Sequence, residues 1–278
     1  MKTSAVETEE IELRLLLEAI FQKYHYDFRG YSTASLKRRL AQALDRLECK
    51  SFSQLQDRVL HDDSLLPYLI GFLTVQVSEM FRDPSYFLCL RRNVLPHLKT
   101  YPSLKVWVAG CCTGEELYSM VILFREEGLE NRTIFYATDI NTHSLEKAKA
   151  GVYELDRIAL FTKNHHESGS KVSLSNYYTA AYGAARFDKS LRERAVFSDH
   201  SLVSDAVFAE AQLISCRNVL IYFNRDLQNR ALGLFKDSLV RKGFLGLGSR
   251  ESLRFSSHTA DFSDFARNER IYQKEESK

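Results

Sequence analysis

Two glycines and an aspartate stand where a parallel sheet would bind a nucleoside. Gly110 and Gly114 frame a loop between an apolar segment, 104–109, and an amphipathic segment that begins at Glu115. A loop of this kind directs backbone N–H groups and the positive end of a helix toward the carboxyl edge of a sheet, and glycine lets a ligand approach the backbone. Asp139 ends the next apolar segment, where a carboxylate can accept hydrogen bonds from both ribose hydroxyls.

The spacing and the charges of this loop favour a cationic or zwitterionic nucleoside over a dinucleotide. The run from Gly110 to Gly114 is not Gly-x-Gly-x-x-Gly. Glu115 and Glu116 open the following helix where a pyrophosphate would sit, and like charges repel. S-adenosylmethionine (AdoMet), which carries a ribose, an amino acid and a sulfonium, suits these residues better. The pattern leaves one alternative open, that the glycines serve only the tight packing of a strand on a helix.

The pattern after about residue 83 predicts the sheet that must position these residues. Apolar segments that alternate with amphipathic ones are typical of a parallel sheet with crossover helices, so we expect a doubly wound α/β fold. The segment 151–200 is irregular and rich in Tyr and Ser, and it is the least readable part. We expect strands at 104–109, 133–138, 212–215, 243–247 and 270–274, and helices at 83–95, 115–127, 145–150 and 225–239.

The first 72 residues instead read as helices with short connections. Apolar residues at helical spacing predict helices over 12–24, 33–47, 52–61 and 65–72. Within 29–46, five basic residues stand against one acidic residue. This basic face is either an ordinary solvated surface or an electrostatic dock for an acidic partner helix.

Composition excludes several classes of protein. The chain has 278 residues, 45% of them hydrophobic, with a formal net charge of +2, which argues against disorder and against a mainly electrostatic nucleic-acid binder. Five cysteines make an odd number, and no signal peptide or membrane-spanning segment is visible, so we expect a cytoplasmic protein without membrane insertion. His165–His166 and Cys111–Cys112 lack metal-ligand spacing, so we predict no metal site.

Four segments resemble the CheR-type chemotaxis-receptor glutamate methyltransferases. They are 73–83, 106–119, 137–140 and 216–223, and they include the long runs Gly-Cys-Cys-Thr-Gly-Glu-Glu and Cys-Arg-Asn-Val-Leu-Ile-Tyr-Phe. The resemblance implies an all-α N-terminal domain over 1–72, which recognises the receptor. It also implies a Rossmann-like AdoMet domain over 73–278, with a small antiparallel β-subdomain inserted at about 177–197.

The same resemblance implies the reaction and the residues that perform it. AdoMet is the cofactor, S-adenosylhomocysteine the product, and the acceptors are glutamates on the cytoplasmic helices of methyl-accepting chemotaxis receptors. The enzyme is expected to be a monomer. Arg82 and Tyr222 lie by the methyl group, Asp139 holds the ribose, and Glu116 lies near the ammonium. The implied cofactor site comprises Gln76, Ser78, Arg82, Gly110, Glu116, Asp139, Ser201, Leu202, Arg217 and Asn218, and the implied receptor dock comprises Lys37, Arg38, Arg39 and Arg46.

Several positions depart from the family pattern. Gln76, Ser78 and Ser201 stand where the family usually has Asn, Thr and Asn, and Leu117 and Arg250 stand where it has Pro and His. Gln and Ser keep the capacity to form hydrogen bonds. These departures leave two alternatives open. One is a methyltransferase of a non-motility chemosensory array, and the other is a degenerate AdoMet- or nucleotide-binding regulator without catalysis.

Overall fold

The computed structural model describes the backbone of residues 2–275 and the side chains of residues 8–275. The chain forms two compact units. Unit 1 comprises the residues up to Val75 together with Tyr222–Gln228, and unit 2 comprises Gln76–Ile221 and the residues from Asn229 onward. Within the described residues, no helix is both long enough and apolar enough to cross a membrane.

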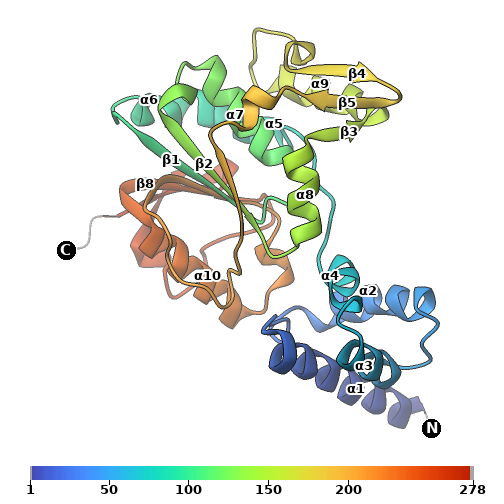
Figure 1. The fold of residues 1–278 in the computed structure, drawn as a ribbon. Helices are drawn as coiled ribbons and strands as arrows, with labels where there is room; N and C mark the ends of the chain where they lie inside the picture. Colours follow the sequence, from blue (N-terminus) through green and yellow to red (C-terminus); the bar gives the residue numbers. More distant parts are fainter. Residues whose placement is uncertain (1, 276–278) are drawn as a thin grey trace. The chain divides into compact units, whose positions relative to one another are not determined.

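Unit 1 is helical, as the sequence predicts. Apolar residues spaced by three and four positions give each helix a buried face, and Ser51 caps one N-terminus by accepting a hydrogen bond from the Gln54 amide at 3.2 Å. The core includes Leu16, Ile20 and Leu36. The helices are α1 (Lys2–Tyr24), α2 (Thr33–Arg46), α3 (Phe52–His61) and α4 (Leu65–Leu73), with α1 packed on α3 and α2 on α4 (Figure 1).

A segment from much later in the chain completes unit 1. The Ser32 amide donates to the Tyr222 carbonyl at 2.8 Å, and the rings of Tyr31 and Phe223 meet edge to face with centroids 4.9 Å apart. The sequence placed the helical domain in residues 1–72 alone. The pairing of Tyr222–Gln228 with residues so distant in the sequence leaves no local pattern. For this reason the sequence did not predict that this segment belongs to unit 1.

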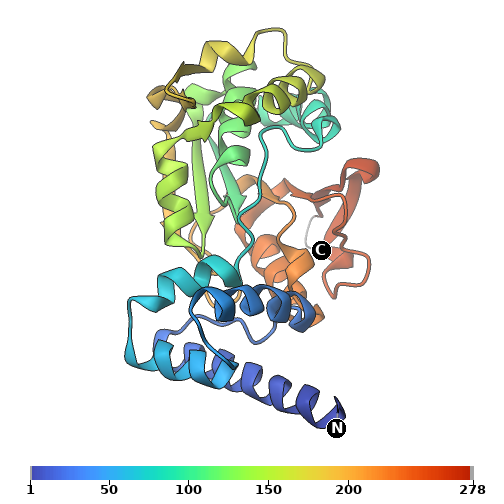
Figure 2. The ribbon, with the colours of Figure 1, turned by 90° about the vertical axis from the view of Figure 1, so that its right-hand side faces the viewer.

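Unit 2 is built on the predicted doubly wound sheet (Figures 1 and 2). Among the described residues the large sheet has seven strands in the order β6-β2-β1-β7-β8-β10-β9. The first five are parallel, and β10 runs antiparallel to both of its neighbours. The strands are β1 (Leu104–Ala109), β2 (Thr133–Asp139), β6 (Ala195–Asp199), β7 (Ala211–Cys216), β8 (Leu239–Leu247), β9 (Phe262–Ala266) and β10 (Ile271–Lys274). The strand order reverses between β1 and β7, where open α/β sheets bind ligands.

Helices and short turns connect and cover these strands. The expected helix over 83–95 is divided into an α-helical, a π-helical and a second α-helical part. The helices are α5 (Pro84–Cys89), η1 (Leu90–Val94), α6 (Leu95–Leu98), α7 (Glu115–Glu126), α8 (Thr142–Ala150), α9 (Ile158–Glu167) and α10 (Arg225–Ser238). The short 3₁₀ turns are η2 (Glu130–Arg132), η3 (Leu155–Arg157), η4 (Leu174–Tyr177), η5 (Lys189–Arg192), η6 (Leu220–Tyr222), η7 (Thr259–Asp261) and η8 (Arg267–Glu269).

A small antiparallel sheet is inserted in unit 2. Its strands are β3 (Val152–Glu154), β4 (Tyr178–Ala181) and β5 (Ala184–Phe187), in the order β3-β5-β4. The segment expected to form this subdomain, 177–197, holds β4 and β5, but its last residues begin β6, which pairs with β2 in the large sheet. The third strand, β3, comes from before the expected segment. Strand pairing between distant residues, and not local composition, decides both differences.

Candidate active site

The glycine loop after β1 needs glycine at both of its ends. Gly110 has φ +70°, and a Cβ atom there would lie 2.5 Å from Cγ2 of Val219. Gly114, which precedes α7, has φ +94°, and its Cβ would lie 2.8 Å from that of Ala148. An L side chain is strained at both positions. Tight packing of the loop against α8 therefore explains the need for Gly114. Gly110 is packed just as tightly against Val219, and it also lies at the carboxyl edge of the sheet.

Asp139 ends β2 beside this loop. Its Oδ2 accepts a hydrogen bond from the Cys112 amide at 2.8 Å, and its Oδ1 accepts one from the Asn141 amide at 2.9 Å. Burial raises the pKa of Asp139, while these two backbone N–H groups lower it. A carboxylate offers about four acceptor positions, so these two bonds leave capacity for ribose hydroxyls. The geometry thus fits the nucleoside that the sequence predicts.

A buried charged group, which we call the Arg217 cluster, lies where α7, β7 and α5 begin or end. It consists of Asp83, Glu116, Ser215 and Arg217. The Arg217 side chain is 1% exposed, and its Nη2 donates at 2.8 Å to both the Arg82 carbonyl and Asp83 Oδ2. Its Nη1 lies 3.3 Å from Glu116 Oε2. Its Nε is buried without a hydrogen-bond partner in the part of the chain that the structure describes.

Glu116 is partly engaged by protein groups within this cluster. Ser215 Oγ donates to Glu116 Oε1 at 2.6 Å, while the long contact with Arg217 involves the other oxygen. The Tyr86 hydroxyl lies 2.9 Å from Ser215 Oγ, and the Arg217 guanidinium stacks 4.2 Å from the centroid of the Tyr86 ring. The carboxylate keeps free acceptor positions, so the role near an ammonium group that the resemblance implies stays a prediction.

Arg82 is anchored through its backbone and not through its side chain. Its neighbour Asp83 pairs with Arg217 and not with the Arg82 side chain. Within residues 8–275 the structure records no hydrogen bond or ion pair for the Arg82 guanidinium, while the Arg82 carbonyl accepts from Arg217 at 2.8 Å. The arrangement fixes the backbone and leaves this cation available to a ligand.

The loop after β6 brings two further predicted residues beside Asp139. The His200 amide donates to the Asp139 carbonyl at 3.3 Å, and Ser201 and Leu202 follow directly. Ser201 Oγ accepts from the Val203 amide at 3.3 Å, and Leu202 is buried. These contacts place the predicted adenosine-binding segments at one edge of the sheet.

Glu251 is a residue of the site that sequence reasoning missed. It is 4% exposed, and its carboxylate accepts hydrogen bonds from the amides of Gly248 at 2.6 Å, Asn218 and Val219 at 2.9 Å, and Ile221 at 3.3 Å. Asn218 has φ +63°, a conformation that costs a non-glycine residue free energy unless its surroundings hold it. Glu251 supplies that restraint. In the sequence, Glu251 is marked only by its position next to Arg250, which itself departs from the family pattern.

Arg157 is the second missed residue, and it ties together the loop that holds Gln76 and Ser78. Arg157 Nη1 pairs with Glu115 Oε1 at 2.9 Å, and its Nη2 donates to the Ser78 carbonyl. Glu115 is fully buried and also accepts from Thr113 Oγ1 at 2.7 Å. Glu115 thus serves the architecture of the loop and does not face a ligand phosphate.

Tyr222 belongs to unit 1, whereas Arg82 belongs to unit 2. The Tyr222 ring faces the Arg39 guanidinium, whose central carbon lies 5.4 Å from the ring centroid. Arg39 Nε donates to the Ser35 carbonyl at 3.2 Å, its Nη2 is buried without a partner among the described residues, and burial lowers the pKa of Arg39. The place of Tyr222 beside the methyl group stays a prediction.

The predicted receptor dock on α2 consists of two kinds of residue. Arg38 and Arg46 are exposed. Lys37 lies 3.6 Å from Glu9 and 3.4 Å from Glu10, and Arg39 packs on Tyr222 as described above. The four basic residues therefore do not present one uniform surface, because Lys37 and Arg39 already interact with other residues of unit 1.

The two paired motifs noted in the sequence, Cys111–Cys112 and His165–His166, lie in different parts of unit 2. Across the described residues, no group of three or more His, Cys, Asp or Glu side chains is arranged to hold a metal ion. Cys112, in the glycine loop, is mostly buried, and burial raises the pKa of its thiol to about 12. This thiol is therefore protonated at neutral pH. His165 lies elsewhere in unit 2, where it contacts Glu126.

Comparison with known proteins agrees with this fold. Residues 76–270 match the SAM-binding domain of CheR methyltransferase, and residues 11–74 match its all-alpha domain. A Pseudomonas putida protein with the provisional name methyltransferase Cher3 is 56% identical over 265 residues, which cover 95% of this chain and 97% of that protein.

Two more distant relatives are named chemotaxis protein methyltransferases. That of Listeria monocytogenes is 29% identical, over 82% of this chain and 84% of its own length. That of Pseudomonas aeruginosa, numbered 2, is 28% identical, over 84% and 85%. With both of its domains matched, the chain belongs to the CheR methyltransferase family and is an AdoMet-dependent methyltransferase.

Proposed function

We propose that this enzyme methylates the side-chain carboxylates of glutamates on the cytoplasmic helices of a chemoreceptor, and so sets the receptor's adaptation. The names of the relatives support a chemotaxis substrate. The observation that carries the proposal is the Arg82 guanidinium, which has no recorded partner within residues 8–275 while Arg217 fixes its backbone. An arginine on an anchored backbone, with an unused fork of donors, is suited to a carboxylate.

Three groups of unit 2 are suited to hold the cofactor. Asp139 accepts from the ribose hydroxyls, Glu116 accepts from the ammonium group, and Gly110 allows close approach to the backbone. When bound, AdoMet would supply the methyl group of its sulfonium: a carboxylate oxygen would bond to the methyl carbon while the methyl–sulfur bond breaks, which would give a methyl ester and leave S-adenosylhomocysteine as a neutral thioether. The amides of Asn218, Val219 and Ile221 donate to Glu251, which keeps the Asn218 loop in one conformation.

The reaction needs no general base from the protein. A glutamate side chain has a pKa of about 4.3 and is already ionised at neutral pH. The work of the enzyme is therefore alignment and exclusion of water, and orientation alone can contribute up to about 7–11 kcal/mol. In this proposal Arg82 orients the incoming carboxylate, and the Tyr222 hydroxyl donates a hydrogen bond near the reacting groups.

The acceptor protein is proposed to dock on α2. Arg38 and Arg46 are the exposed members of the predicted set, so they are the residues that can attract an acidic helix. Arg39 has a different part in this proposal, since it packs on Tyr222 and positions that ring. Charge reversal of Arg38 and Arg46 should raise the KM for the acceptor and leave AdoMet affinity unchanged.

The test uses purified enzyme, AdoMet with a radioactive methyl group, and recombinant cytoplasmic fragments of chemoreceptors from the source organism. The expected product is base-labile label on the receptor fragment, because methyl esters release methanol in base. Fragments with Gln in place of the acceptor glutamates serve as the negative control. Arg82→Ala should lose transfer to a far greater extent than it weakens AdoMet binding by calorimetry. AdoMet binding without base-labile label on any fragment contradicts the proposal.

A further inference from the structure

A groove on unit 2 carries an excess of positive charge. It has a volume of about 710 Å³ and is formed by the segment after Glu251 together with β9, η8 and the start of β10. The residues that line the groove include three arginines and three aromatic residues: Arg254, Arg267, Arg270, Phe255, Phe262 and Tyr272.

The arginines of this groove outnumber the acids that could neutralise them. Asp264 is the one carboxylate among the described lining residues, and it lies 3.9 Å from Arg267 Nε. For the guanidinium groups of Arg254 and Arg270, the structure records no ion pair or hydrogen bond within residues 8–275. Cations in a concave site that lack internal partners attract an anionic ligand.

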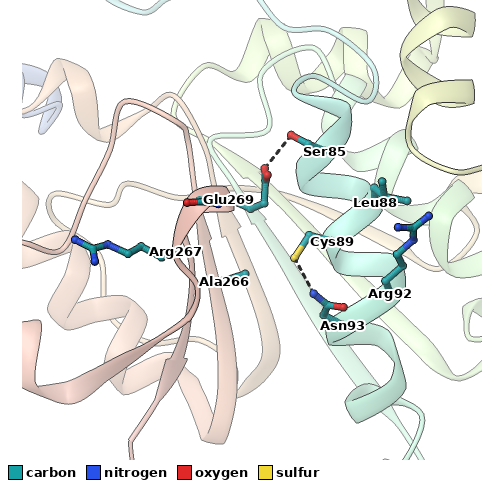
Figure 3. A pocket seen from close by; sticks show the side chains of 9 residues that line it. Ser85, Leu88, Cys89, Arg92, Asn93, Ala266, Arg267 and Glu269 are labelled. Atoms are coloured by element: carbon teal, nitrogen blue, oxygen red, sulfur yellow. Dashed lines mark hydrogen bonds between the residues drawn. The ribbon is translucent and has the colours of Figure 1, made fainter.

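The carboxylate of the η8 turn faces a different hollow. Glu269 Oε2 accepts a hydrogen bond from Ser85 Oγ at 2.9 Å. Figure 3 shows Glu269 directed toward Ser85 on α5, whereas the Arg267 side chain extends away from that helix. Glu269 is therefore committed to α5 and does not line the arginine groove.

Aromatic rings give the groove an apolar component. Phe262 and Tyr272 are 7% and 5% exposed, so only small parts of their rings reach the surface, while Phe255 is 74% exposed. Protein-binding surfaces combine exposed aromatic side chains, such as Phe255 here, with polar and charged groups around them. A small inorganic anion can pair with the arginines but gains nothing from the aromatic rings. A polypeptide segment with both acidic and apolar side chains can pair with the arginines and also contact the rings.

The groove also shares backbone with the candidate active site. Glu251, which holds the Asn218 loop, lies three positions before Arg254. The Leu247 amide donates to the Arg270 carbonyl at 3.0 Å, which ties the start of β10 to the end of β8. A chain bound in the groove is thus held by the same segments that shape the cofactor edge.

We infer that this groove binds an acidic segment of the protein that carries the methyl acceptor. Arg254, Arg267 and Arg270 pair with its carboxylates, and Phe255 contacts its apolar side chains. The inference rests on the proposed function for the identity of that protein. The preference of the groove for acidic polypeptide, however, is a property of these residues and is measurable by itself.

The first test measures binding of a fluorescein-labelled dodecapeptide of repeated Glu-Glu-Leu, with the Gln-Gln-Leu peptide as its uncharged match. The full chain should bind the acidic peptide about tenfold more tightly than the neutral one, and R254E/R270E should weaken acidic-peptide binding by about tenfold. The control K171E/K189E reverses two exposed charges of unit 2 that do not line the groove and should leave binding unchanged. Calorimetry with AdoMet checks that every variant is folded.

Three results would overturn the inference. One is equal affinity of wild type and R254E/R270E for the acidic peptide. Another is displacement of the peptide by inorganic phosphate at the peptide's own concentration, which would indicate a small-anion site. The third is binding to phosphatidylglycerol vesicles with no peptide binding, which would indicate a membrane surface.

The transfer assay separates this inference from the proposed function. With receptor fragments as acceptors, R254E/R270E should raise the acceptor KM and leave the affinity for AdoMet unchanged. If wild type methylates no fragment but still binds the acidic peptide in a charge-dependent way, the proposed function fails and the groove assignment stands. If wild type methylates fragments with a KM that R254E/R270E does not change, the groove assignment fails and the proposed function stands.

Discussion

Unit 2 contains two buried polar clusters that resemble each other in composition and differ in completeness. The Glu126 cluster comprises Arg91, Glu126, His165, Ser170 and Tyr177. In it the Glu126 carboxylate accepts from Arg91 at 2.6 Å, from His165 and Ser170 at 2.8 Å, and from Tyr177 at 3.1 Å. The Arg217 cluster also joins an arginine, a glutamate and a serine, but its arginine–glutamate contact is 3.3 Å.

The two arginines show the difference most clearly. Arg91 uses all three guanidinium nitrogens, on Glu126, Glu127 and the Ser168 carbonyl. Arg217 leaves Nε buried without a partner among the described residues. Buried polar groups are nearly always satisfied, so an incomplete network in a folded protein needs an explanation. We interpret the complete cluster as structural and the incomplete one as kept ready for a ligand. Each prediction below tests that distinction.

The largest expected effect is on stability, in the complete cluster. Glu126→Ala removes the acceptor of four donors and leaves the buried His165 ring without this partner, while Arg91 keeps Glu127, so the loss should be about 3 kcal/mol of unfolding free energy, the lower end for a broken buried pair. Denaturant titration measures this loss. Calorimetry at a temperature where the variant is folded should give an unchanged Kd for AdoMet. A large rise in that Kd would mean that the Glu126 cluster also serves the cofactor.

Acid should remove much of the same stabilisation. Burial by itself raises the pKa of Glu126, but hydrogen bonds from His165, Arg91 and Ser170 hold it at about 2. Because this pKa lies below the unfolded value of about 4.3, the ionised group contributes up to about 3 kcal/mol above pH 5, and this is lost as pH falls toward 2. The difference in unfolding free energy between wild type and Glu126→Gln should therefore shrink over that range. A constant difference would contradict the assignment.

The third prediction concerns the arginine of the incomplete cluster. Arg217→Lys keeps the charge, but an ammonium group cannot span Glu116, Asp83 and the Arg82 carbonyl at once. We expect the Kd for AdoMet to rise about tenfold, or about 1.4 kcal/mol. Arg91→Lys is the matched control, and it should lower stability without changing that Kd. Equal effects of the two variants on cofactor affinity would remove the distinction between the clusters.

The sequence revealed the local parts of this architecture and few of the distant contacts. Gly110 and Asp139 were identified because a loop and a strand end carry local signals, and alternating apolar segments predicted the order of the elements. Glu251 and Arg157 were missed, because their importance lies in contacts with amides and carbonyls far away in the sequence. The sequence also failed to predict that Tyr222–Gln228 belongs to unit 1, for the same reason. Long-range hydrogen bonds between backbones leave no periodic pattern.

The smallest expected effects come from a matched pair of serines. Ser170 Oγ donates to Glu126 at 2.8 Å, and Ser215 Oγ donates to Glu116 at 2.6 Å. Both serines are buried, and replacement by alanine removes the same hydroxyl from the same kind of partner. A typical hydrogen bond contributes about 0.5–1.5 kcal/mol, and we expect losses near the lower end of this range because other donors remain.

The two serine variants should differ in which property changes. In Ser170→Ala, Glu126 keeps its other three donors, so stability should fall slightly while the Kd for AdoMet stays constant. In Ser215→Ala, Glu116 keeps the long contact with Arg217 as its recorded hydrogen bond within residues 8–275, so its carboxylate is free to move. We expect the Kd for AdoMet to rise about threefold, since misplacing one charged acceptor weakens a preorganised site. If both variants lose stability equally and neither changes the Kd for AdoMet, the Arg217 cluster is structural as well. The unpartnered Nε of Arg217 would then not indicate a ligand-binding site.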